Sequence, residues 1–248
     1  MRIEYFKSNV LKFQFLLSFS FFSFFADFTS AQGYVGLKAG LNYSSFYGDK
    51  WKPLDDENYG SYQPIENKYR SNPRFLWTVG GVMKFPINEI WTIQPECIYS
   101  AKGDKIIQQR IISKNNLKIL NEFSYKIKLH YFEIPILLRY QLRQRLDLLG
   151  GLRFSYLMRS KSKSENIFQY YDNSSGEMIL EEKFSNITST EIKDIKRFDP
   201  GIAAGIGYKV DSCINIGIRA SMGANRIYKD EHKYKNLDFQ LTVSYFIK

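Results

Sequence analysis

The fold class is decided by the stretch Val35-Gly36-Leu37-Lys38-Ala39-Gly40-Leu41-Asn42-Tyr43. Apolar or aromatic side chains occupy every second position, and glycine, lysine and asparagine fill the positions between them. Successive side chains of a strand point to opposite faces of a sheet. The stretch therefore predicts a strand with one apolar face and one polar face.

The same alternation recurs along the chain, and the lengths of the connections alternate as well. Long segments follow the first, third, fifth and seventh strands, whereas short turns follow the second, fourth and sixth. This pattern is typical of outer-membrane barrels. The sequence therefore predicts an all-β fold, an eight-stranded antiparallel transmembrane β-barrel with long extracellular loops and short periplasmic turns. The predicted strands cover residues 33–44, 74–85, 91–102 (with a bulge at Pro95), 130–140, 146–158, 198–210, 213–223 and 236–246.

The N-terminus has the three parts of a secretory signal. Arg2, Lys7 and Lys12 give a positive start, residues 13–25 are apolar, and Thr29-Ser30-Ala31 offers small residues before a cleavage site. We therefore predict a signal peptide at 1–31 and a barrel domain at 32–248. Cleavage would deliver the mature chain to the outer membrane.

Composition limits the classes of partner. The chain has 248 residues, 17% aromatic residues and a net charge of +10. Aromatic girdles at membrane interfaces account for the high aromatic content. A positive net charge often indicates binding to nucleic acid, but an exported protein does not meet nucleic acid, so we expect no nucleic-acid partner. The expected partners are outer-membrane lipid and lipopolysaccharide, the barrel-assembly machinery, and a surface or secretion partner.

Three segments resemble a known family. They are residues 36–42, the run Tyr131-Phe132-Glu133-Ile134-Pro135-Ile136-Leu137-Leu138-Arg139-Tyr140, and the glycine-rich strand 201–208. Together they resemble the PorT-type outer-membrane β-barrel family of Bacteroidetes-like bacteria. The founding member is implicated in type IX protein secretion, so the resemblance implies a barrel and raises a secretion or surface-assembly component as an alternative function.

The predicted inner face is strongly charged. A barrel of about eight strands has a lumen only wide enough for side chains, and buried charges must be paired. We therefore predict an ion-pair network that plugs the lumen, with Glu133 paired to Arg139 and Glu96 to a basic neighbour. The network comprises Lys38, Arg74, Lys84, Glu96, Lys102, Glu133, Arg139, Asp147, Arg153, Asp199, Lys209, Arg219 and Asp238.

Signals for catalysis and metal binding are weak, and we predict no enzyme, cofactor or metal. A rim-located lipid-modifying enzyme remains a second alternative, with His130 or His232 as base and Ser100 or Ser221 as nucleophile. Residues 55–57 are an acidic turn that calcium also suits. Cys97 and Cys213 are predicted on opposite faces, which argues against a disulfide.

The predicted function is therefore structural or binding, through the extracellular loops. Mixed aromatic and polar side chains suit carbohydrate or protein contacts, and they equally suit packing of the loops on one another. The candidate recognition residues are Tyr47, Trp51, Tyr59, Tyr62 and Tyr69.

Overall fold

A computed structural model describes residues 33–48, 66–114, 117–172, 174–190, 195–228 and 234–247. The predicted signal peptide lies outside these residues. No helix in the described part of the chain is long and apolar enough to cross a membrane. The strands are β1 (Tyr34–Tyr47), β2 (Glu66–Pro86), β3 (Trp91–Lys114), β4 (Leu117–Arg143), β5 (Leu146–Asp172), β6 (Met178–Thr190), β7 (Phe198–Lys209), β8 (Ile214–Gly223) and β9 (Lys235–Ile247).

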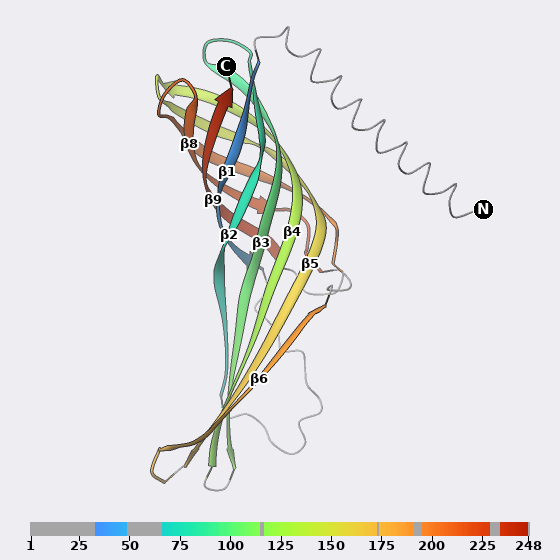
Figure 1. The fold of residues 1–248 in the computed structure, drawn as a ribbon, viewed down its shortest axis with the longest axis vertical. Helices are drawn as coiled ribbons and strands as arrows, with labels where there is room; N and C mark the ends of the chain where they lie inside the picture. Colours follow the sequence, from blue (N-terminus) through green and yellow to red (C-terminus); the bar gives the residue numbers. More distant parts are fainter. Residues whose placement is uncertain are drawn as a thin grey trace, which may run out of the picture.

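Eight of these strands close into a ring. β1 pairs with both β2 and β9, and the antiparallel pairing continues through β3, β4, β5, β7 and β8 until the circle is complete. β6 stands outside the ring, because it pairs only with residues 162–171 of β5. The predicted eight-stranded antiparallel barrel is confirmed, and Figure 1 shows the ring at the top of the view.

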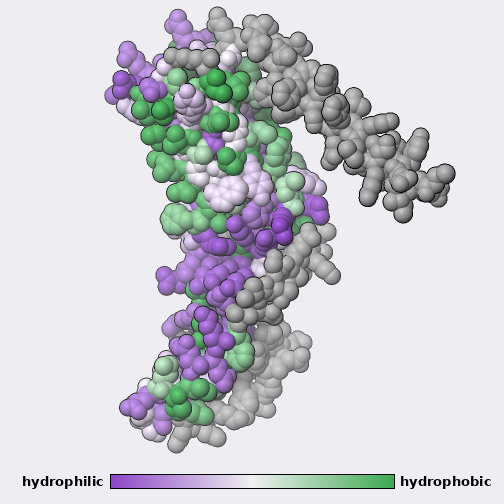
Figure 2. Space-filling view, in the orientation of Figure 1, coloured by the Kyte–Doolittle hydropathy of each residue, from purple (hydrophilic) through white to green (hydrophobic). Residues whose placement is uncertain are grey.

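The alternation of side chains places polar residues inside the ring. In β1, Lys38 and Asn42 are buried, whereas Leu37 and Leu41 are exposed. The same parity holds around the barrel, which gives it the apolar outer surface visible in Figure 2. Outward-facing apolar side chains include Phe75, Trp77, Val79, Ile93, Phe132, Ile134, Ile136, Leu138, Leu148, Leu152, Tyr156, Ile202, Ile206, Ile218, Phe239, Leu241 and Val243.

Two predicted long connections, residues 103–128 with flanks expected to extend the strands and residues 159–195 with a hairpin expected near 167–180, are paired strands over most of their described length. β3 continues to Lys114 and returns as β4, while β5 runs on to Asp172 and returns as β6. Ladder hydrogen bonds satisfy the backbone of these polar segments, so they do not need an apolar face to stay extended. The protruding sheet, here called the blade, comprises residues 66–73 of β2, 104–114 of β3, 117–128 of β4, 159–172 of β5 and all of β6. It extends downward in Figure 1.

The expected bulge at Pro95 is absent from the β3–β4 ladder. Ile93 lies opposite Leu138, Pro95 opposite Ile136, and Ile98 opposite Glu133, which is one continuous register. Register shifts occur elsewhere, in β2 between Pro73 and Thr78 and between β4 and β5 beside His130.

The short turns follow the expected chemistry. The Asn88 Oδ1 atom accepts hydrogen bonds from the backbone N–H groups of Ile90 and Trp91. Asp211 Oδ1 likewise accepts from Cys213 and Ile214. Such side-chain bonds are why Asn and Asp favour turns. These turns lie at the end of the barrel opposite the blade.

Candidate functional site: the barrel lumen

The first charged cluster of the lumen centres on Arg153 of β5. Its Nη1 lies 3.3 Å from Glu133 Oε1 and 3.2 Å from Asp238 Oδ1, and its Nη2 lies 3.3 Å from Asp199 Oδ2. Lys102 Nζ reaches Glu133 at 2.7 Å and Asp238 at 2.5 Å. Two cations, from β3 and β5, thus bind three carboxylates from β4, β7 and β9. All five side chains are buried.

A second cluster surrounds Glu96 of β3. Its Oε1 lies 2.7 Å from Lys38 Nζ, and its Oε2 lies 2.8 Å from Arg219 Nη1. Gln94 donates to the same carboxylate, and Arg219 also donates to Gln240 Oε1. Glu96 therefore has the basic neighbours that its sequence position suggested.

A third cluster stands near the short turns and corrects one expected pair. Arg139 Nη2 lies 3.4 Å from Asp147 Oδ2, and Lys209 Nζ lies 3.7 Å from Asp147 Oδ1. Glu133 pairs with Lys102 and Arg153 rather than with Arg139. The prediction of a Glu133–Arg139 pair was wrong, because the two residues lie six positions apart along one strand, about 20 Å at strand rise.

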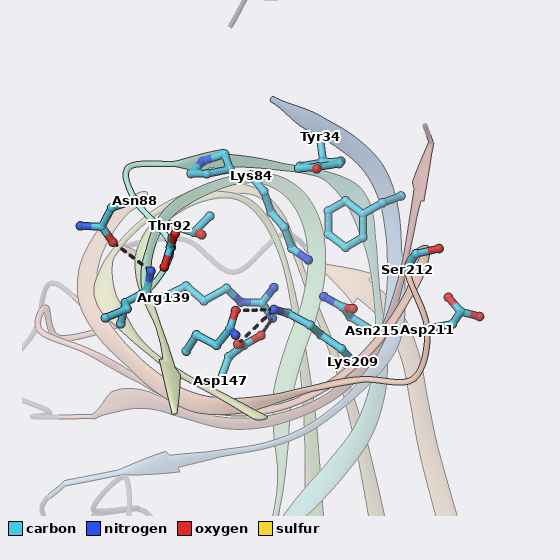
Figure 3. Close-up of a pocket in the computed structure, with 15 residues that line it drawn as sticks. Tyr34, Lys84, Asn88, Thr92, Arg139, Asp147, Lys209, Asp211, Ser212 and Asn215 are labelled. Carbon is cyan, nitrogen blue, oxygen red and sulfur yellow. Dashed lines mark hydrogen bonds and ion pairs between the residues drawn. The ribbon is translucent and has the colours of Figure 1, made fainter. Parts of the chain in front are cut away.

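A pocket of about 440 Å³ opens beside this third cluster. Figure 3 shows Arg139, Lys209 and Asp147 together on one side, with Lys84 pointing in from the other. The Lys84 Nζ atom lies 3.7 Å from the centroid of the Phe246 ring. The pocket is the mouth of the lumen at the short-turn end.

Arg74 lies apart from the three clusters. Its guanidinium donates to the backbone carbonyl of Ile127 at 2.9 Å, at the blade end of the barrel. It is half-buried there, and its hydrogen-bond acceptor is a backbone carbonyl rather than a carboxylate.

An apolar cluster, which the sequence analysis missed, lies inside the barrel at the blade end. Leu129 and Ile127 of β4 are fully buried, and Ile195 and Ile227 pack on them from the connections before β7 and after β8. A bridge between Ile195 and Tyr228 joins those two connections. The alternation of β4 was the available signal, because it continues past the predicted start of that strand. The other buried members are Phe46, Ile106, Tyr131, Leu157 and Tyr234.

Asp104 is a buried polar residue that the sequence analysis also missed. Its Oδ2 accepts hydrogen bonds from the backbone N–H of Phe46 at 2.9 Å and from Ser71 Oγ at 2.7 Å. A third bond comes from Ser45 Oγ at 3.0 Å. Asp104 thereby ties the ends of β1 and β2 to β3 at the base of the blade.

Glycines make room for the charged side chains. A Cβ atom on Gly223 would lie 2.5 Å from Asp199 Oδ2, and one on Gly207 would lie 2.5 Å from Arg139 Nη2. Both distances are far inside van der Waals contact. The inward-facing glycines of β7 and β8 are thus part of the ion-pair geometry.

Comparison with known proteins supplies the family. A family model described as the outer membrane protein beta-barrel domain matches residues 25–229. The chain belongs to this family. It is a small outer-membrane β-barrel, and its apolar outer face is the face that meets lipid.

Several solved outer-membrane barrels are similar to this barrel at low identity. Ail, the attachment invasion locus protein of Yersinia pestis, is 12% identical with a TM-score of 0.40, over 87% of this chain and 99% of that chain. Neisserial surface protein A is 7% identical with a TM-score of 0.36, over 85% and 96%. OprG from Pseudomonas aeruginosa is 10% identical with a TM-score of 0.31, over 88% and 96%. No curated protein matches the sequence.

Among the described candidate catalytic residues, the serines and His130 do not come together. Ser100 is buried inside the lumen, where Asn42 Nδ2 donates to its hydroxyl at 2.7 Å. His130 has the parity of Phe132 on the outer face, and its Nδ1 lies 2.9 Å from the Tyr99 hydroxyl. The sheet separates the two side chains. Ser221 is also buried, and His232 lies outside the described residues.

The described residues also bear on metal binding and disulfide formation. Among the described residues, no group of three His, Cys, Asp or Glu side chains could hold a metal ion. The acidic turn at 55–57 lies outside the described residues. Cys97 and Cys213 are both free thiols.

Two of the candidate recognition residues contact their own chain. Tyr47 Oη donates to the Gly223 carbonyl at 3.2 Å, and the Tyr69 hydroxyl accepts from Gln108 Nε2 at 2.7 Å. Trp51, Tyr59 and Tyr62 lie outside the described residues.

Proposed function

We propose that this outer-membrane barrel is a sealed anchor that presents the blade for binding at the cell surface. The observation that carries the proposal is a long protruding sheet attached to a barrel whose interior holds buried ion pairs and, at the blade end, a buried apolar cluster. β4 has 27 residues, whereas a strand needs only about 9 to 11 residues to cross a membrane. Most of the remaining length lies beyond the apolar belt, where it can meet an external partner.

The orientation follows from the lengths of the connections. Barrels of this class place short turns in the periplasm and long segments outside the cell. A cleaved signal at 1–31 would supply the export step, and the barrel-assembly machinery the insertion step. The blade then faces the surroundings of the cell, and lipid and lipopolysaccharide surround the belt.

The charge clusters serve the anchor role. Arg153 and Lys102 join side chains from β3, β4, β5, β7 and β9 through buried pairs. Removing one partner of such a pair is strongly destabilising, because the other charge is left buried. The lumen is thereby a rigid support for the blade.

The resemblance to PorT-type barrels supports the same anchor, and a secretion component is the alternative within that class. The two functions require different parts of the protein. A secretion component requires a stoichiometric partner in the membrane or periplasm, whereas a surface binder requires the blade for its binding.

Trimming the blade tests the proposal. Ile107 lies opposite Ser124, and Glu165 lies opposite Ser185, so residues 108–123 and 166–184 can each be replaced by an Asn-Gly hairpin turn. Cells that display the full chain should adhere to polysaccharide- or protein-coated surfaces, and cells with the trimmed barrel should not. Equal adhesion of both, with the trimmed barrel folded, would overturn the proposal.

A further inference from the structure

A bulge in β5 decides where its basic residues point. His130 of β4 lies opposite Arg159, but the next residue, Tyr131, lies opposite Leu157. Met158 is therefore an extra residue, and it shifts the alternation of side chains by one position. Tyr156 is exposed before the bulge, and Arg159 is exposed after it, with Ser160 buried. The bulge turns the following odd-numbered cations onto the outer face.

These cations form like-charged rows with their neighbours on β4. Lys128 lies directly opposite Lys161, and Lys126 directly opposite Lys163. Like charges placed opposite each other destabilise a sheet. The rows therefore need anions close by.

An internal carboxylate balances only the row farther from the belt. Glu165 Oε1 lies 2.9 Å from Lys163 Nζ, and its Oε2 lies 2.9 Å from Lys126 Nζ. The hydrogen bonds from Lys163 and Lys126 lower the pKa of Glu165 to about 2. This row is neutralised within the protein.

The row nearer to the belt has no such partner. Within the described residues, no carboxylate pairs with Lys128, Arg159 or Lys161, here called the basic triad. Burial, and then the nearby charges of Arg74 and Lys161, lower the pKa of Lys128. The described part of the chain therefore supplies no anion to the basic triad.

The height of the basic triad above the apolar belt favours an anion at the membrane surface. Phe132, an aromatic residue of the apolar belt, follows Lys128 by four residues on the same face of β4, or about 13 Å of strand. A tilt of 35–45° reduces this height to about 10 Å. The polar headgroup layer is about 5 to 8 Å deep on each side of the hydrocarbon, and lysine side chains reach several ångströms toward it. Figure 2 shows the change from apolar to hydrophilic surface below the barrel wall.

We infer that Lys128, Arg159 and Lys161 bind the phosphate group of an anionic lipid in the leaflet that surrounds the blade end of the barrel. The guanidinium of Arg159 offers a paired-donor fork to phosphate oxygens, and the two lysines supply point charges beside it. The inference uses the barrel's place in the membrane and not the proposed adhesion by the blade. The two therefore fail independently.

Trp77 can report on this lipid. Its ring centroid lies 5.2 Å from that of Tyr99, whose hydroxyl lies 2.9 Å from His130 Nδ1, and His130 faces Arg159 across the ladder. In a Trp51→Phe, Trp91→Phe background, Trp77 fluorescence is measured in vesicles of phosphatidylcholine and phosphatidylglycerol in which one or the other lipid is brominated. Brominated phosphatidylglycerol should quench more strongly than its share of the mixture.

Charge variants decide the outcome. Lys128→Gln with Lys161→Gln should lower the preference for phosphatidylglycerol by about fivefold for each lysine removed. Lys128→Arg with Lys161→Arg should keep the preference, and so should the matched control Lys118→Gln with Lys183→Gln on the exposed distal blade. No preference in the unsubstituted triad, or equal loss in the control, would overturn the inference. A preference displaced by a soluble phosphorylated polysaccharide would also overturn it, because the ligand would not be a membrane lipid.

Discussion

Arg153 Nη1 donates to Asp238 Oδ1 over 3.2 Å across the lumen, although 85 positions separate the two residues in the chain. The same guanidinium holds Glu133 and Asp199. Replacing Arg153 with Met leaves three buried carboxylates with Lys102 as their remaining basic partner in the cluster. We expect the free energy of unfolding to fall by about 3 to 5 kcal/mol.

Urea unfolding of the refolded barrel in lipid vesicles measures this loss. Lys118→Met on the exposed distal part of β4 is the control and should change the free energy of unfolding by less than about 0.5 kcal/mol. A similar small change for Arg153→Met would mean that the cluster contributes little to the fold.

Gly223 and Gly150 provide a matched pair of glycine substitutions. A Cβ on Gly223 would lie 2.5 Å from Asp199 Oδ2, whereas a Cβ on Gly150 would meet nothing within 4 Å. Gly223→Ala should therefore push Asp199 away from Arg153 and destabilise the barrel by about 1 to 3 kcal/mol. Gly150→Ala should be close to neutral in the same unfolding measurement. Equal effects would show that the space around Asp199 is not tight.

Leu129 tests the apolar closure. It is fully buried, so Leu129→Ala should open a cavity and lower the free energy of unfolding by about 2 to 5 kcal/mol. Leu152 faces outward and is 54% exposed. Leu152→Ala should therefore lower the free energy of unfolding, measured in lipid vesicles, by distinctly less than Leu129→Ala. A larger loss for Leu152→Ala than for Leu129→Ala would contradict this assignment of the core.

Glu165 predicts a pH dependence in the blade. Its pKa is lowered from 4.5 to about 2 by hydrogen bonds from Lys163 and Lys126. A depressed carboxyl pKa adds stability that is complete above the unfolded pKa of 4.5 and disappears as the pH falls through 2.

The free energy of unfolding of the parent and of Glu165→Gln, followed between pH 6 and pH 2, measures this effect. The pair lies at the surface, so the difference at pH 6 should be about 0.2 to 1 kcal/mol. It should vanish near pH 2. A difference that stays constant over this range would contradict the assignment.

The barrel itself could be predicted because its signal is local. Alternation such as Leu37-Lys38-Ala39 fixes both strand and face, and a change of register by one residue would expose every polar side chain to lipid. The pairing partners of the buried charges could not be predicted in the same way. Parity places Glu133 and Arg139 on one face, but only the order of strands around the ring brings Arg153 and Lys102 to Glu133.

The blade was predicted only in part: a hairpin near residues 167–180 was expected and is present, but the full length of the paired strands was not expected. Residues 159–172 have no apolar face, and the extra residue Met158 breaks the alternation that leads into them. Polarity alone suggested a loop, whereas pairing with β4 and β6 satisfies the backbone. At Pro95 the sequence predicted a bulge that the structure lacks. Proline usually interrupts a ladder, but here it lies in a continuous β3–β4 register.

The central claim is that the lumen is sealed by the apolar cluster and the charge clusters. Current measurement across planar lipid bilayers that contain the refolded, full barrel tests it most directly. The account predicts no stepwise current, because the three charged clusters and the apolar cluster around Leu129 occupy the lumen. A stable current, proportional to voltage and present in every insertion, would contradict it.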